Sequence, residues 1–339
     1  MKKIFGTLPG GETACLYTIT GAGLTAEISD YGATIVKLLV PDAKGNVADV
    51  VLGFDDPNEY TASGTFFGAA VGRNANRVRN GRFSLNGKEY QMGINDNGVH
   101  SLHSGPDFWK NRLWKVEEHL PDRIRLSLLS PDGDQGFPGN AEIRVTYSLE
   151  NPGTLRICYD AVSDKDTVFN FTNHSYFNLA GHDHPERAMS QLLSMPARFF
   201  NPDDDLSIPT GELRSVEGTP FDFRTPKAIG RDIGQDYDAL KLQGGYDHNF
   251  EVFADPCAIL SDPESGRTMA VSTDCPGVQF YSGNFLEGET GKGGISYVHR
   301  SGICLETQFY PDSVNHPEWP QPFVKANTPY HSETKYKFV

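Results

Sequence analysis

The chain has 339 residues, of which 38% are hydrophobic and 11% aromatic, so it can bury a substantial core and is too rich in aromatic residues for disorder. Its 44 acidic and 30 basic side chains give a formal net charge of −14. This balance argues against nucleic acid, anionic membranes and highly phosphorylated compounds as partners, and a neutral small molecule fits it best.

Short segments with alternating apolar and polar residues begin near the N-terminus and predict strands. The first three are residues 14–19, 24–29 and 34–40, separated by glycine-containing turns. Residues 83–90 carry Asn86-Gly87 between two short runs, which predicts a hairpin. Further strands are expected at 113–119, 123–130, 141–149, 154–163, 191–197, 212–217, 248–253, 258–260, 268–273, 278–282 and 303–309.

Helical periodicity is weak throughout the chain, and only residues 55–62 and 226–240 are expected to form short helices. The 35 glycines and 22 prolines are typical of a β-rich protein with many turns. No low-complexity linker or internal repeat divides the sequence. We therefore predict an all-β fold, one large antiparallel β-sandwich of about fifteen strands or more, with residues 1–339 as a single domain.

The five cysteines are scattered and show no Cys-x-x-Cys spacing, which favours a reducing compartment and indicates neither a zinc site nor a redox pair. The N-terminal residues M-K-K-I-F-G lack the apolar run of a secretory signal. No apolar stretch approaches the roughly 18 residues that span a bilayer. We expect a cytoplasmic protein without a membrane association.

Two polar runs with strand character carry ionisable residues. Residues 173–181 read N-H-S-Y-F-N-L-A-G and contain His174, and residues 304–313 read C-L-E-T-Q-F-Y-P-D-S and contain Glu306. A carboxylate in such a run costs free energy if it is buried without a partner. Taken alone, His174 is a satisfied core histidine and Glu306 is half of a structural ion pair. Together they are the groups needed to move a proton on and off a neutral substrate.

Four further segments are each most simply turns or polar loops when taken one at a time. They are V-G-R-N-A-N-R-V (71–78), H-S-L-H-S-G (100–105), G-G-Y-D-H-N-F (244–250) and P-G-V-Q-F-Y-S-G-N (276–284). Taken in order with the two runs above, the six segments resemble the aldose 1-epimerase, or galactose mutarotase, family. The resemblance covers the chain from about residue 20 to its C-terminus.

The resemblance implies a β-supersandwich whose open cleft holds a free monosaccharide. It implies that Glu306 is the general base that takes the anomeric hydroxyl proton and that His174 is the general acid that protonates the ring oxygen. Mutarotation needs one proton removed and one delivered, so no cofactor and no metal are required. Glu306 is also expected to raise the pKa of His174 and keep it a competent acid.

The same resemblance implies that several residues bind the sugar hydroxyls, namely Asn76, Arg77, His103, Asp247 and Gln279. Aromatic residues near these motifs are candidates for packing against the sugar's apolar face, namely Tyr176, Phe177 and Phe285. Arg73, His100 and His248 are interpreted as supporting or structural residues. The preferred aldose is left open among glucose, galactose, xylose and arabinose, and the protein is expected to be a monomer or weak homodimer.

Three other functions compete with this one. A zinc site at His100-x-x-His103 is disfavoured because that spacing on a strand or turn does not put both rings on one face. A glycoside hydrolase would use Glu306 and Asp247 as its paired carboxylates. A sugar-binding protein without catalysis would use the same polar lining, although it would have no need of His174 and Glu306 together.

Overall fold

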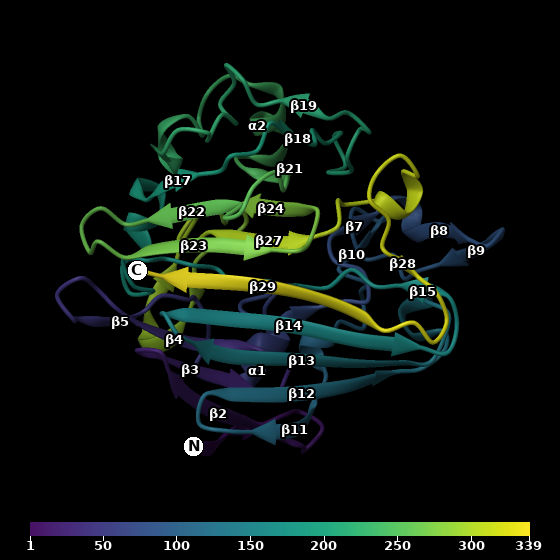
Figure 1. The fold of residues 1–339 in the computed structure, drawn as a ribbon, viewed down its shortest axis with the longest axis horizontal. Helices are drawn as coiled ribbons and strands as arrows, with labels where there is room; N and C mark the ends of the chain where they lie inside the picture. Colours follow the sequence, from purple (N-terminus) through teal and green to yellow (C-terminus); the bar gives the residue numbers. More distant parts are fainter.

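The computed structural model describes residues 1–339, and antiparallel strands build most of it (Figure 1). The strands of the N-terminal half are β1 (Lys2–Thr7), β2 (Thr13–Gly21), β3 (Leu24–Ser29), β4 (Ile35–Pro41), β5 (Val47–Asp49), β6 (Ala70–Val71), β7 (Arg77–Val78), β8 (Arg82–Leu85), β9 (Lys88–Gln91), β10 (Ser101–Leu102), β11 (Lys115–His119), β12 (Arg123–Ser130), β13 (Ala141–Glu150) and β14 (Thr154–Ser163).

Those of the C-terminal half are β15 (Thr167–Val168), β16 (Thr172–Asn173), β17 (Leu192–Ser194), β18 (Phe199–Phe200), β19 (Arg214–Ser215), β20 (Lys227–Ala228), β21 (Asp247–Glu251), β22 (Ala258–Ser261), β23 (Thr268–Thr273), β24 (Gly277–Tyr281), β25 (Glu289–Thr290), β26 (Ser296–Tyr297), β27 (Cys304–Gln308), β28 (Phe323–Val324) and β29 (Tyr330–Phe338). The α-helices are α1 (Pro57–Ala62) and α2 (Asp238–Gln243), and the 3₁₀ turns are Arg79–Gly81, Trp109–Asn111, Asp134–Gly136, Pro185–Ser190, Ile229–Arg231, Lys292–Gly294 and Ser313–Asn315.

A nine-stranded antiparallel sheet forms the front layer in Figure 1, in the order β11-β12-β13-β14-β29-β23-β22-β17-β20. Strict alternation of buried and partly exposed residues along β13 puts Ile143, Val145 and Tyr147 on its inner face. The five-stranded meander β1-β2-β3-β4-β5 lies behind this sheet, with β2 against β12 and β13. The all-β sandwich predicted from the sequence is confirmed.

A second five-stranded sheet has the order β19-β18-β21-β24-β27, and its strand β27 is seen next to β23 in Figure 1. The Tyr336 hydroxyl on β29 donates to the Leu305 carbonyl on β27 at 3.1 Å, which joins the two layers. Phe250, Val278 and Leu305 from this second sheet enter a core cluster of 56 buried residues that extends from Cys15 to Phe338. The opposite face of β21, β24 and β27 is therefore free to be polar.

The hairpin of β8 and β9 has the turn predicted from Asn86-Gly87, since both residues have positive φ, 52° and 75°. Strand β29 is long and central yet was not predicted. Two of its inward-facing residues, Ser332 and Thr334, are polar, so the sequence of this strand shows no clear alternation of apolar and polar residues.

The helix predicted over 226–240 is wrong except at its end, where α2 begins at Asp238. Lys227 and Ala228 form strand β20, and Gly230 and Gly234 interrupt the segment between. The helix predicted over 55–62 is confirmed by α1, which Asp56 caps in a capping box with Glu59. No helix of the structure is both long enough and apolar enough to span a lipid bilayer.

Candidate active site

One face of β21, β24 and β27 forms the floor of the site. Side chains alternate along a strand, so the residues next to core residues point the other way. Glu306 lies opposite Gln279 in the strand register, and Cys304 lies opposite Tyr281, which in turn lies opposite Asp247. The three short strands thus bring the predicted Glu306, Gln279 and Asp247 onto one polar surface.

The opposite wall comes from segments far away in the sequence. His174 directly follows β16, and its backbone is fixed by hydrogen bonds to Ala69 and Gly68 at 3.0 and 3.1 Å. His103 and Asn76 lie in left-handed turns with φ of 51° and 62°, and the His103 backbone N–H donates to the Asn76 carbonyl at 3.0 Å.

These walls enclose a cavity of about 420 Å³, a volume suited to a monosaccharide. It is lined by Gly64, Thr65, Phe66, Asn76, Arg77, Leu102, His103, His174, Tyr176, Asp247, Tyr281, Phe285, Leu286, Glu287, Glu289 and Glu306. Every predicted site residue except Gln279 is in this lining. Gln279 is buried behind Asp247 and donates to Asp247 Oδ1 at 2.8 Å, so it reaches the cavity through that carboxylate.

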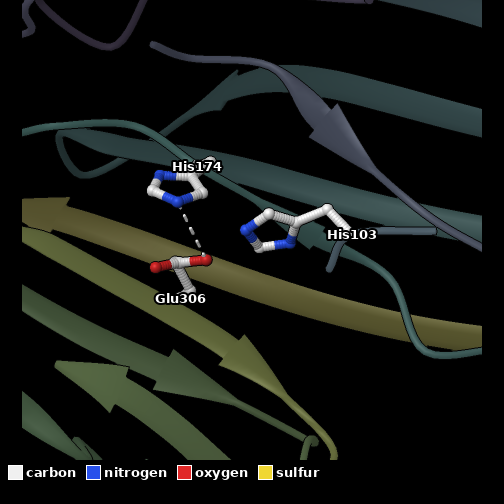
Figure 2. Close-up of side chains that lie close together, drawn as sticks. All are labelled: His103, His174 and Glu306. Atoms are coloured by element: carbon white, nitrogen blue, oxygen red, sulfur yellow. Dashed lines mark ion pairs between the residues drawn. The ribbon is translucent and has the colours of Figure 1, made fainter. Parts of the chain in front are cut away.

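His174 and Glu306 face each other across the cavity floor (Figure 2), with His174 Nε2 3.6 Å from Glu306 Oε2. Both side chains are buried, and Glu306 Oε2 has no hydrogen-bond partner within the protein. A buried acceptor without a partner is costly, and such atoms are typical of sites that await a ligand. The imidazole stacks on Tyr176, with ring centroids 5.1 Å apart and planes at 16°.

Burial determines the charge state that this pair favours. It lowers the pKa of His174 to about 3 and, together with the nearby Asp247 carboxylate, raises the pKa of Glu306 well above its usual range. The expectation that Glu306 raises the pKa of His174 is therefore wrong, because desolvation dominates the pKa of the histidine and Glu306 itself favours its neutral form. Without a ligand, both groups favour their neutral forms.

His103 has a fixed tautomer. Its Nδ1 accepts the backbone N–H of Asn76 at 3.1 Å, so in the neutral ring the proton is on Nε2. Burial, followed by His174 and Arg77, lowers the pKa of His103 well below its ordinary value and keeps the ring neutral. His103 thus offers an N–H to an oxygen of a ligand.

The same tautomer bears on metal binding. Ligand atoms of His103, His174 and Glu306 lie within 4.8 Å of one another, a spacing that a metal ion could bridge. A His103 nitrogen that carries a proton has no lone pair for the metal, so the set favours hydrogen bonding over coordination. A second group, Cys158, His331 and Glu333, lies on β14 and β29, where Arg156 and Lys335 already pair with Glu333.

Arg77 and Asp247 both line the cavity, and each influences the charge of the other. The Arg77 Nε donates to Asp96 Oδ2 at 2.9 Å, and although burial opposes its charge, the Asp247 and Asp96 carboxylates raise its pKa. Burial raises the pKa of Asp247, while Arg77 and the Gln279 hydrogen bond oppose that rise. The cavity therefore presents fixed charge-assisted donors and acceptors, which is what recognition of hydroxyl groups needs.

The aromatic residues divide between cavity and core. Tyr176 and Phe285 line the cavity as expected, but Phe177 packs on Tyr336 in the core, since adjacent residues of an extended chain point to opposite sides. Phe66 was missed by sequence reasoning, although it contacts both His103 and His174, with ring centroids 4.7 and 5.7 Å away. Its G-T-F-F segment has no local pattern that marks it as functional.

Three residues interpreted as supporting or structural are not part of the cavity lining. Arg73 is fully buried and donates to the carbonyls of residues 130, 131, 138 and 139. His100 accepts the Asn80 backbone N–H at 3.0 Å, and His248 packs on Phe221 with centroids 4.8 Å apart.

Similar proteins agree with a sugar site in this fold. The family described as Aldose 1-epimerase matches residues 15–337. Galactose mutarotase of Bos taurus is 41% identical over 99% of this chain and 98% of its own length, and aldose 1-epimerase of Escherichia coli K12 is 38% identical over 98% and 97%. Among solved structures, the GalM/aldose epimerase homologue of C. elegans has a TM-score of 0.88 at 32% identity and covers 96% of this chain and 99% of its own.

The fold, with its buried pair of His174 and Glu306, is that of a β-supersandwich enzyme of the galactose mutarotase type. The chain belongs to the aldose 1-epimerase family. It is an isomerase that interconverts the α and β anomers of free aldoses.

Proposed function

We propose that the enzyme catalyses this reaction with Glu306 as general base and His174 as general acid, on neutral aldoses such as glucose and galactose. The observation that carries the proposal is the buried pair itself, with Nε2 and Oε2 3.6 Å apart and Glu306 Oε2 lacking a partner. A hydroxyl of a bound sugar would supply the missing hydrogen bond.

In the forward step, Glu306 takes the proton of the anomeric hydroxyl while His174 delivers a proton from Nε2 to the ring oxygen. The bond between the anomeric carbon and the ring oxygen breaks, and the oxygen that lost its proton forms the aldehyde. Rotation about the adjacent carbon–carbon bond presents the other face. The now protonated Glu306 and neutral His174 then close the ring in reverse.

The neutral character of the pair of His174 and Glu306 is compatible with this cycle. A protonated Glu306 beside a neutral His174 holds as many protons as an ionised Glu306 beside an imidazolium. Only the position of one proton differs, and sugar hydroxyls that replace water as hydrogen-bond partners would stabilise the ionised arrangement. Binding would therefore set up the base and the acid without exchange with solvent.

The substrate class follows from the lining and from relatives. Arg77, Asp247 and His103 supply donors and acceptors suited to hydroxyl groups, with Asn76 beside them and Gln279 holding Asp247. Galactose is proposed because several relatives are named galactose mutarotase. The acidic Glu287 and Glu289 in the lining oppose phosphorylated sugars.

We also propose a domain organisation, a cellular location and an oligomeric state for the protein. Residues 1–339 act as one domain, which the core cluster from Cys15 to Phe338 supports. A cytoplasmic location is supported by five buried cysteines without disulfide bonds. A monomer or weak homodimer that acts without cofactor, membrane or nucleic acid completes the proposal.

Polarimetry of freshly dissolved α-D-glucose and α-D-galactose tests the proposal. Purified protein, dialysed against EDTA, should speed the approach of both optical rotations to their equilibrium values. Activity lost on chelation and restored by a divalent ion would refute the metal-free mechanism. Release of a reducing sugar from an alkyl galactoside, without any acceleration of mutarotation, would favour a glycoside hydrolase instead.

A further inference from the structure

Cys304 contacts the proposed general acid on the side away from Glu306. Its Sγ lies 3.5 Å from His174 Nδ1, while His174 Nε2 faces Glu306 at 3.6 Å. Cys304 and Glu306 are two residues apart on β27 and therefore share one face of the strand. The imidazole thus lies along β27 with one nitrogen over each of these side chains.

The ring has little freedom to leave this arrangement. Tyr176 and Phe66 both lie nearly parallel to it, at 16° and 21°, with centroids 5.1 and 5.7 Å away. Stacking of this kind fixes the ring plane and leaves the two edge contacts to decide which nitrogen carries the proton. Cys304 is fully buried, so no solvent competes for Nδ1.

The Cys304 thiol can hydrogen-bond His174 both when the ring is neutral and when it is protonated. Burial raises the pKa of Cys304 well above its usual range, and the Glu306 and Asp247 carboxylates add to the rise, so the sulfur keeps its proton. The sulfur accepts weakly from a ring N–H, and Nδ1 carries this proton both in the imidazolium and in the neutral ring left after Nε2 has given up its proton. His103 differs from His174, because its Nδ1 accepts from a backbone N–H. A backbone N–H can only donate, so this contact favours a single tautomer of the neutral His103 ring.

We propose, resting on the function proposed above, that Cys304 is a positioning residue for His174. Its sulfur accepts from Nδ1–H both in the neutral ring and in the imidazolium. Nε2 is then the nitrogen that gains a proton and delivers it to the sugar's ring oxygen. Because the bond to sulfur is weak, it favours this tautomer without trapping either charge state.

The competing explanation is that Cys304 only fills space beside Tyr176 and Tyr281, in the cluster of 14 buried residues to which it belongs. Cys304→Ala and Cys304→Ser separate the two explanations, because serine keeps a group that both donates and accepts. We expect kcat within about threefold of wild type for the serine variant and about tenfold lower for the alanine variant, the effect of about one hydrogen bond, with KM nearly unchanged in both.

A spectroscopic measurement gives a result that packing alone would not produce. The ¹⁵N shifts of the His174 ring, identified by their loss in His174→Asn, should show the proton on Nδ1 in the free wild-type enzyme and a mixture of tautomers in Cys304→Ala. Cys257→Ala, at a buried cysteine bonded to the Val271 carbonyl, is the matched control and should change neither tautomer nor kcat.

If the alanine variant does not fold, Cys304→Thr and Cys304→Val replace the pair, since they match in shape and differ by one hydroxyl. Threonine should then preserve the tautomer and kcat better than valine. Equal kcat and an unchanged tautomer in both members of a pair would overturn the proposal. The tautomer is read without sugar, so it tests Cys304 even if the wild-type enzyme fails in polarimetry, an outcome that would instead refute the proposed function.

Discussion

The two faces of the β21-β24-β27 sheet are built from neighbouring residues and do opposite things. Leu305 and Phe280 point into the main core, where removal from water stabilises the fold. Glu306 follows Leu305 and Gln279 precedes Phe280, so both lie on the polar face of the sheet, Glu306 in the cavity lining and Gln279 behind Asp247. Each keeps a buried oxygen atom without a partner. Because side chains alternate along a strand, one short segment both stabilises the fold and holds a site whose buried polar atoms are costly.

The largest effect is expected on the cavity face. Glu306→Gln and His174→Asn should each lower kcat by roughly 10²-fold or more, because each removes one proton-transfer group and leaves the fold intact. Sugar affinity, measured by calorimetry, should change far less. A kcat near that of wild type in either variant would remove that residue from the mechanism.

The core face should respond in the opposite way. Leu305→Ala should lower the free energy of unfolding by about 2–5 kcal/mol, since it leaves a cavity between β27 and β29. Urea denaturation measures this loss, and polarimetry on the folded enzyme should give a kcat within a few fold of wild type. A large loss of kcat with little loss of stability would contradict the view that the core face stabilises the fold and the cavity face serves catalysis.

A smaller effect is expected where residues hold the sugar. Asp247→Asn should lower kcat about tenfold as well as weaken binding, because a misplaced ring loses hydrogen-bond distances to both catalytic groups. Arg77→Ala should act mostly through KM, by about tenfold, as loss of a charged hydrogen bond would. Steady-state polarimetry separates the two parameters, and the reverse pattern would exchange the roles of these residues.

The smallest effect concerns stability and pH. Burial raises the pKa of Glu306, so the folded protein binds this proton more tightly than the unfolded chain does. Stability from this group is therefore present below the unfolded pKa and is lost as the pH rises toward the folded value. Glu306→Gln should gain about 1 kcal/mol or more over wild type at pH 8.5, and less at pH 5, by urea denaturation.

The control for this prediction is Glu12→Gln, at an exposed carboxylate in the turn before β2. It should show no pH-dependent gain, because its charge stays in water in both states. A Glu306→Gln variant that is no more stable than wild type at pH 8.5 would mean that the buried carboxylate is compensated by its surroundings.

The sequence predicts those strands and site residues that depend on a local pattern of residues. Alternation along residues 141–149 and 154–163 predicts β13 and β14, and the polar residues within strand-like runs single out His174 and Glu306. Strand β29 was not predicted because two of its inward-facing residues, Ser332 and Thr334, are polar. The strand therefore lacks the apolar–polar alternation that marks a strand in the sequence.

The site is less predictable where it depends on contacts between distant segments. Phe66 lies far from His103 and His174 in the sequence, and the fold brings it into contact with both rings. Gln279 lies behind Asp247 because of the pairing of β21 with β24. The pKa of His174 was predicted in the wrong direction because the depth of burial is a property of all the surrounding layers.

The most direct test is a crystal structure of Glu306→Gln with bound galactose, in which turnover is slow and the ring is retained. The anomeric hydroxyl should lie within about 3 Å of residue 306, and the ring oxygen within about 3 Å of His174 Nε2, with Arg77, Asp247 and His103 around the other hydroxyls. A sugar bound elsewhere, or turned so that neither oxygen meets these two groups, would contradict the acid–base pair at the centre of the account.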